Sequence, residues 1–225
     1  MNLVAALPFA ALGAVLGLDT VSFPQAMISR PIVAATLAGA FAGDAARGLA
    51  LGAILELVAL GTLPFGASRY PDWGNASVVG GAMYASGAAA PAGQLALALL
   101  AALLTAWVSS ESMIVVRHAN ARWAQRARGA LDSGDRRAVV GLQLRGLTAD
   151  LVRGAIVTGG ALLLLQPAFG AIAGQWNSGE ATERAVIAGI TAALGAGTIW
   201  TLVRGTSGTR LLILLGLAVG AALVA

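Results

Sequence analysis

The chain has 225 residues, of which 58% are hydrophobic and only 11% are charged. Its mean hydropathy is +0.81, whereas about a quarter of the residues in a soluble domain are charged. This composition excludes an ordinary soluble domain and predicts an all-α protein in a lipid bilayer, because helices satisfy their own backbone hydrogen bonds there. The chain has no cysteine, which excludes disulfides and thiolate-bound metals.

Apolar stretches follow one another along the chain and give the predicted helices. They cover residues 3–18, 31–43, 49–63, 77–92, 95–110, 154–167, 185–203 and 211–225. About 20 helical residues are needed to cross a bilayer, and only 185–203 comes close to that length. We therefore expect a single domain over 1–225, a polytopic transmembrane helix bundle with short, broken or re-entrant segments in its N-terminal half. Such breaks are typical of transporters.

The first apolar stretch lies where a signal peptide would lie. It has no basic segment before it and no convincing cleavage site after it. We therefore expect residues 3–18 to remain in the mature protein.

A polar segment separates the first two apolar stretches. It contains Asp19, Gln25 and Arg30, and Pro31 is suited to begin the next helix. We take Asp19 and Gln25 as candidate substrate-binding residues. Asp19 could equally mark the end of the first helix.

Glu56 lies in the middle of the apolar stretch 49–63. A carboxylate at such a position costs a few kcal/mol on insertion, so it usually faces a polar cavity or a partner. We predict a role in substrate binding. The alternative is a structural ion pair with Arg30 or Arg47.

A turn-rich break occupies residues 64–77 and contains the candidate binding residues Ser68, Asp72 and Asn75. Broken helices with polar side chains are where transporters bind solutes. The same proline, aspartate, glycine and asparagine content is also typical of an ordinary solvated loop.

The stretch 117–147 is polar and strongly basic. Its arginines are Arg117, Arg122, Arg126, Arg128, Arg136, Arg137 and Arg145, against only two aspartates. The positive-inside rule predicts that this stretch is cytoplasmic, either as a loop or as an interfacial helix ending at a turn near Gly134. It could bind the membrane surface or dock a soluble partner, for which we select Arg126, Arg128, Arg136 and Arg137.

Familiar enzyme motifs are missing from the sequence, including the Walker loop, GxGxxG, GxSxG and HExxH. The single histidine, His118, has no recognisable base-and-orienter set around it. We therefore expect a transport protein that has no catalytic residues, bound metal or cofactor.

Three stretches resemble the IIC subunit of the mannose/fructose/sorbose family of phosphotransferase system permeases. They are Arg30-Pro31 to Gly43-Asp44, Leu51-Gly52 through Leu55-Glu56-Leu57 to Gly61, and Gly66-Ala67 through Pro71-Asp72 to Ala76-Ser77. Their order and spacing are similar to the family's, and the resemblance covers residues 1–165 well.

The resemblance implies a heteromeric permease of the bacterial inner membrane. The IIC subunit would pair with a IID membrane subunit, bind a hexose with it at mid-membrane and pass the hexose to soluble IIA/IIB phosphotransfer proteins. The family's Leu-Glu motif falls on Glu56 and its Pro-Asp motif falls on Asp72.

Two other functions stay open on the sequence alone. The chain could be a stand-alone secondary transporter in which Glu56 takes up protons. It could also be a non-transporting scaffold or sensor that recruits soluble phosphotransfer proteins through its Arg-rich stretch.

Overall fold

A computed structural model describes residues 1–20, 22–62, 69–87, 91–173, 175, 179–203, 208, 211, 213–216 and 218. Its helices are α1 (Leu3–Asp19), α2 (Pro31–Ala42), α3 (Ala45–Ala59), α4 (Trp73–Ser86), α5 (Pro91–Arg126), α6 (Arg128–Asp132), α7 (Arg136–Ala173) and α8 (Glu180–Val203). The described part of the chain contains no strand, and the predicted all-α fold with short N-terminal helices is confirmed.

The expectation that only 185–203 approaches membrane-spanning length was too narrow. Within the described residues, Gly93–Arg126 and Arg136–Ala173 are also long and apolar enough to cross a membrane, beside Arg184–Thr201. Helices α5 and α7 continue well beyond the apolar stretches 95–110 and 154–167. The flanking polar sequence is rich in arginine, glutamine and alanine, which favour helix. The predicted stretch 211–225 lies mostly outside the described residues.

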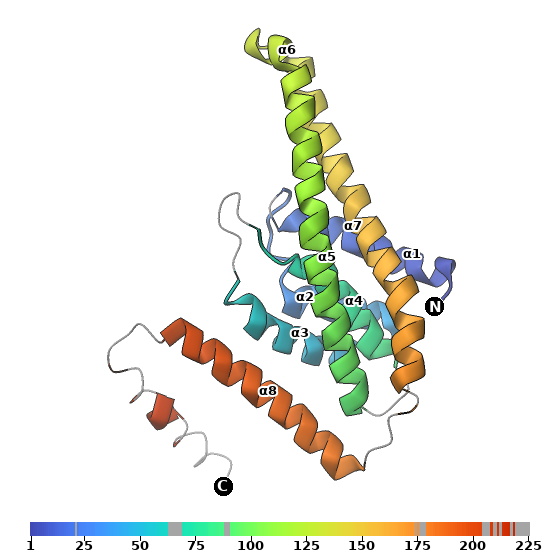
Figure 1. The fold of residues 1–225 in the computed structure, drawn as a ribbon, viewed down its shortest axis with the longest axis vertical. Helices are drawn as coiled ribbons and strands as arrows, with labels where there is room; N and C mark the ends of the chain where they lie inside the picture. Colours follow the sequence, from blue (N-terminus) through green and yellow to red (C-terminus); the bar gives the residue numbers. More distant parts are fainter. Residues whose placement is uncertain are drawn as a thin grey trace.

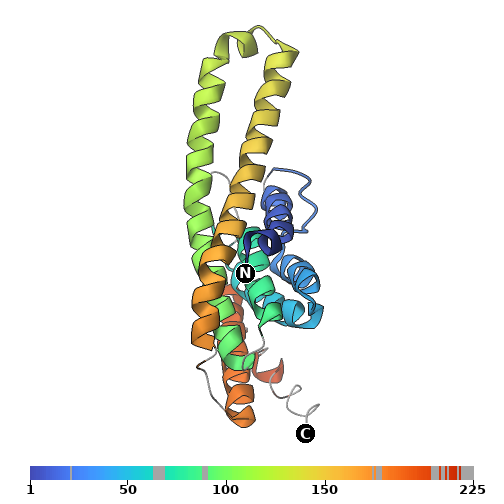
Figure 2. The same ribbon diagram turned by 90° about the vertical axis from the view of Figure 1, so that its right-hand side faces the viewer.

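Helices α5 and α7 form a long antiparallel hairpin that projects beyond the other helices, with α6 at its tip (Figures 1 and 2). The basic stretch 117–147 makes up this projecting end, so it is helical and continuous with α5 and α7. The chain reverses at Gly134, whose φ of 74° lies in the left-handed region that glycine adopts without strain.

Helices α1 to α4 pack beside the lower part of the hairpin (Figure 1). Helix α4 is central, and every residue from Trp73 to Ala85 is buried. Small residues allow this packing, since a Cβ atom on Gly81 would lie 2.6 Å from the carbonyl oxygen of Ala35 on α2. Helices without large side chains at their contact can approach closely in this way.

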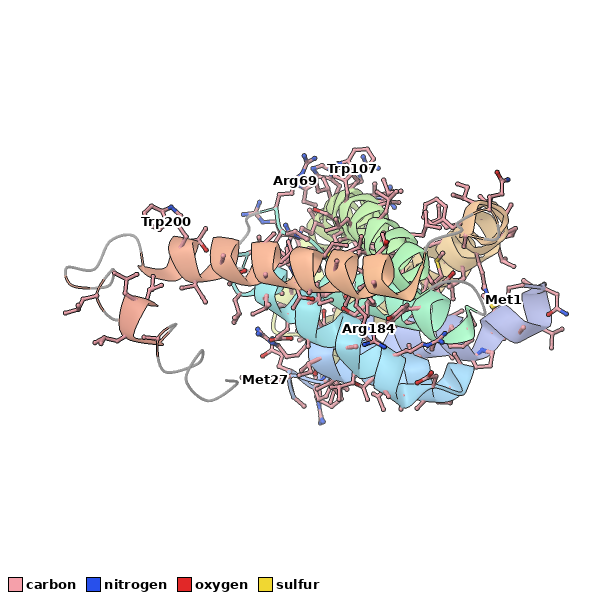
Figure 3. The ribbon with its side chains drawn as sticks, turned by 90° about the horizontal axis from the view of Figure 1, so that it is seen from below. Met1, Met27, Arg69, Trp107, Arg184 and Trp200 are labelled. Carbon is pink, nitrogen blue, oxygen red and sulfur yellow. The ribbon has the colours of Figure 1, made fainter. Side chains whose placement is uncertain are left out.

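Helix α8 crosses α3 and the lower end of α5 (Figure 1). Thr198 anchors it by donating a hydrogen bond of 2.7 Å to the carbonyl oxygen of Leu57. Figure 3 shows Trp200 on the end of α8 that extends past the other helices, where it is 53% exposed. Exposed apolar side chains also cover α5 and α7, including Leu103, Trp107 and Ile156, as expected for a surface that faces lipid.

Candidate functional site

A cavity of about 360 Å³ lies where the segment 19–31, the end of α3 and the start of α4 meet. We call it the first cavity. Its polar lining consists of Asp19, Thr20, Gln25, Ser29, Arg30, Thr62 and Trp73. Its volume falls at the small end of the range of about 300–1,000 Å³ that is usual for small-molecule sites.

Asp19 shapes the wall of the first cavity. Its carboxylate accepts hydrogen bonds from the backbone N–H groups of Ala26 at 2.6 Å and Ser29 at 2.8 Å. These bonds fold residues 22–29 into a tight loop in which Gln25 has a φ of 60°. The carboxylate also accepts from the backbone N–H of Ile28 and from the Ser29 side chain. Because a carboxylate has about four lone-pair positions, Asp19 serves mainly to hold this loop in place at the cavity.

Glu56 does not line the first cavity itself but contacts a residue that does. It forms an ion pair with Arg30, which lines the cavity, and accepts a hydrogen bond of 3.2 Å from the backbone N–H of Ile32. That N–H belongs to the first turn of α2, where backbone donors have no partner within the helix. Of the two ion-pair partners that the sequence offered, the structure selects Arg30, while Arg47 pairs with Asp44 at 3.3 Å.

Trp73 supplies the aromatic wall of the first cavity. Its indole N–H donates a hydrogen bond of 2.8 Å to the hydroxyl oxygen of Thr62. The bond fixes the indole ring beside the carboxylate, guanidinium and amide groups of the lining. Carboxylates and amides bind hydroxyl groups, and an aromatic face accepts an apolar ligand surface.

A second group of polar residues is buried deeper, between α4, α5 and α7. We call Asp72, Asn75, Ser109, Asp150 and Arg153 the Arg153 cluster. Asp72 precedes α4 as its N-cap, accepting from the backbone N–H of Asn75. Its Oδ2 atom also accepts from the Asn75 amide at 2.6 Å, the Ser109 hydroxyl at 2.7 Å and Arg153 Nη1 at 3.0 Å.

Arg153 holds this cluster together. Its Nε donates to Asp150 at 2.7 Å and its Nη1 donates to the Ser109 hydroxyl at 2.7 Å. The side chains of Arg153, Asp72 and Asp150 are 4%, 2% and 11% exposed. Asp150 in turn accepts a hydrogen bond of 3.2 Å from the hydroxyl of Ser22. The cluster therefore ties the loop of the first cavity to α7.

The structure distributes the predicted binding residues between these two groups. Asp19 and Gln25 line the first cavity, and Glu56 reaches it through Arg30. Asp72 and Asn75 belong to the Arg153 cluster, although Trp73 between them lines the cavity. Ser68 lies outside the described residues. The four predicted docking residues are exposed around the tip of the hairpin: Arg126, Arg128, Arg136 and Arg137.

The sequence reasoning did not select Arg153, Asp150 or Ser109. A signal was present, because Asp150 and Arg153 are three residues apart at the start of the apolar stretch 154–167. Residues at this spacing are neighbours on one helix face, and ionisable residues beside an apolar stretch often pair within a membrane protein.

Comparisons with known proteins give a consistent result. The profile of the family described as "PTS system sorbose-specific IIC component" matches residues 3–224. The mannose-specific EIIC component of Escherichia coli K12 is 30% identical over 127 residues, which are 56% of this chain and 46% of that protein. The sorbose-specific EIIC component of Klebsiella pneumoniae is 35% identical over 103 residues, 44% of this chain and 38% of that protein.

These alignments span less than half the length of the curated relatives. Two solved structures share the fold over 98% of this chain and 87% of their own chains, each at 22% identity. One is described as a membrane protein and has a TM-score of 0.69. The other is a cryo-EM structure of the mannose transporter ManYZ with microcin E492, with a TM-score of 0.62.

Proposed function

Because the chain belongs to the sorbose-specific IIC family of phosphotransferase system components and is a multi-pass membrane protein, we propose that it binds a hexose and passes it to a cytoplasmic phosphorylating partner. It would do so together with a IID-type membrane subunit. Phosphoryl transfer itself is assigned to the soluble IIA/IIB partners.

The observation that carries this proposal is the composition of the first cavity. Gln25 offers an amide to sugar hydroxyl groups on a loop that Asp19 holds in place, and the Trp73 ring offers a flat surface to the C–H face of the sugar. Arg30 offers N–H donors, and its ion pair with Glu56 holds the guanidinium at the cavity. A neutral hexose thus meets donors, acceptors and an apolar face within one volume of about 360 Å³.

We assign two kinds of role to the remaining candidate residues. Glu56 acts through Arg30 because the ion pair fixes the direction of the guanidinium. Asp72 and Asn75 hold the first turn of α4, and with it the neighbouring Trp73. Ser68 keeps its predicted role in sugar binding, outside the described residues.

The tip of the hairpin is the proposed docking surface for a IIB-type protein. Arg126, Arg128, Arg136 and Arg137 are all exposed there, and the positive-inside rule assigns this end to the cytoplasm. A surface of one charge sign attracts a partner of the opposite sign and raises its association rate.

The exposed apolar side chains of α8, such as Ile199 and Trp200, suit a membrane-embedded partner of the IID type.

Reconstitution in proteoliposomes tests the proposal. The chain and its IID partner are incorporated together, phosphorylated IIB is supplied on the side of the hairpin tip, and labelled mannose, fructose and sorbose are supplied on the other side. We expect sugar phosphate to accumulate only when all components are present. Proton-dependent uptake by the chain alone would instead indicate a secondary transporter. Binding of IIB without any sugar binding would indicate a scaffold or sensor.

A further inference from the structure

A second cavity of about 310 Å³ opens between α5 and α7, where the hairpin leaves the other helices. We call it the crevice. Its polar lining consists of Ser22, Arg117, Asn120, Gln143 and Asp150, and Gly146 also lines it. The crevice therefore lies between the Arg153 cluster, which shares Asp150, and the basic tip of the hairpin.

The crevice contains hydrogen-bond acceptors that are not fully used. Asn120 Oδ1 is buried and has no hydrogen-bond partner within the structure. Asp150 uses one oxygen for Arg153 and the other for the Ser22 hydroxyl, but each carboxylate oxygen has a second lone pair. Because a buried acceptor without a donor is unfavourable, a ligand that brings O–H or N–H groups would be stabilised here.

The charges of the crevice favour a neutral ligand. Arg117 contributes one positive charge and Asp150 contributes one negative charge to the lining. Asp150 is also shared with Arg153, whose charge is offset by Asp72. The Arg117 guanidinium lies over the Tyr70 ring, with 5.4 Å between its carbon and the ring centroid, so the side chain has a defined position.

Gly146 provides the space for a ligand on the α7 side. A Cβ atom there would lie 3.6 Å from Asn120 Nδ2 and 3.7 Å from Asn120 Oδ1. These are ordinary van der Waals distances, so an alanine would fit without strain and would occupy space beside the unpaired Asn120 oxygen.

We propose that the crevice is a second binding site for a neutral, hydroxyl-rich ligand, and that its occupant is the hexose after it leaves the first cavity. This inference rests on the proposed sugar-binding function. The loop 22–30 forms part of both walls, since Ser22 lines the crevice while Gln25 and Arg30 line the first cavity. A sugar that passes this loop towards the basic tip reaches the crevice next.

Equilibrium binding to the complete membrane complex tests this second site. Labelled mannose, fructose and sorbose are titrated, and the number of sugars bound per chain is measured for wild type, Asn120→Leu and Gly146→Ala. We expect two sugars per wild-type chain. Both variants should still bind one sugar at the first cavity, and their affinity for the sugar in the crevice should fall at least tenfold. Asn120→Leu removes the buried acceptor, and Gly146→Ala fills the space beside it.

Gly141→Ala is the matched control, since it lies on the same helix and its added Cβ would meet nothing within 4 Å. It should bind two sugars as wild type does. Gln25→Ala should weaken sugar binding at the first cavity and leave binding in the crevice unchanged.

The possible failures are distinguishable. One sugar per wild-type chain, unchanged in Asn120→Leu and Gly146→Ala, would overturn the second site and leave the proposed function intact. If the wild-type chain binds one sugar and Gly146→Ala binds none, the second site is also overturned, because the crevice would then be the single sugar site. Absence of any sugar binding to the wild-type complex would overturn both proposals.

Discussion

Two arginine–carboxylate pairs of this protein lie in different environments. In the Arg153 cluster, the side chains of Arg153 and Asp72 are 4% and 2% exposed. At the first cavity, the side chains of Arg30 and Glu56 are 30% and 18% exposed. The first pair is enclosed by α4, α5 and α7, whereas the second stands at the edge of a cavity.

The difference in exposure indicates that these two pairs, although chemically alike, have different roles. Arg153 meets two carboxylates and the Ser109 hydroxyl, and these contacts fix three helices relative to one another. Arg30 meets one carboxylate and lines an open volume. The enclosed pair should therefore govern stability, and the partly exposed pair should govern ligand binding.

Removing Arg153 should have the largest effect. Arg153→Met leaves Asp72 and Asp150 buried without a cation, and breaking a buried pair in this way costs about 3–5 kcal/mol of folding free energy. Thermal unfolding of the purified complex in detergent measures the loss. Arg153→Lys keeps the charge but not the two-sided guanidinium geometry, so its stability should be intermediate.

The control for this comparison is the exposed pair of α6. Arg128 lies 3.8 Å from Asp132, and their side chains are 83% and 72% exposed. Exposed pairs contribute between about 0 and 1 kcal/mol, so Arg128→Met should unfold at nearly the wild-type temperature. Equal losses in Arg153→Met and Arg128→Met would contradict the structural role of the cluster.

A smaller loss of folding free energy is expected from removing a hydrogen bond between uncharged side chains at the Arg153 cluster. Thr158 donates a hydrogen bond of 2.8 Å to Asn75 Oδ1, and both residues are fully buried. Thr158→Val keeps the shape and removes the donor, which should cost about 1 kcal/mol. Thr191→Val on the exposed side of α8, where the hydroxyl bonds within its own helix, is the control. A Thr158→Val protein as stable as that control would show that the Asn75 bond contributes little.

The smallest effect on stability is expected at the tip of the hairpin. Replacing Arg126, Arg128, Arg136 and Arg137 together by Gln removes four exposed charges and should leave the unfolding temperature nearly unchanged. Binding of the IIB-type partner should weaken most at low ionic strength, because salt screens surface charges. Partner binding that is the same as wild type in low salt would exclude the tip as the docking surface.

The sequence predicted the helices well where apolar length and composition decide the structure. The stretches 3–18 and 31–43 correspond closely to α1 and α2. The polar stretch 117–147 was harder to interpret, because arginine and alanine favour helix but do not say whether that helix lies along a membrane or projects from it. Its position follows from pairing of α5 with α7, which is a long-range contact.

The candidate site was predicted in part. Glu56 was selected because a carboxylate within an apolar stretch is costly, and one of its two possible partners, Arg30, proved to be the one it contacts. Asp72 was selected from a turn-rich break, but its contact with Arg153 joins residues 81 positions apart in sequence. Nothing in local spacing indicates which distant arginine meets which carboxylate, so the separation into an enclosed and an open pair required the structure.

The partly exposed Arg30–Glu56 pair gives the most direct test of the central claim that the first cavity binds the sugar. The measurement is the affinity of the complete complex for mannose, fructose and sorbose, with Glu56→Gln compared with wild type and thermal unfolding recorded on the same samples. Loss of the charge that holds Arg30 should weaken binding of the preferred sugar about ten- to a hundredfold, since hydrogen bonds to charged groups contribute about 1.5–3 kcal/mol. The loss of stability should be smaller than in Arg153→Met. Unchanged sugar affinity together with a large loss of stability would contradict the account, because Glu56 and Arg30 would then only support the fold.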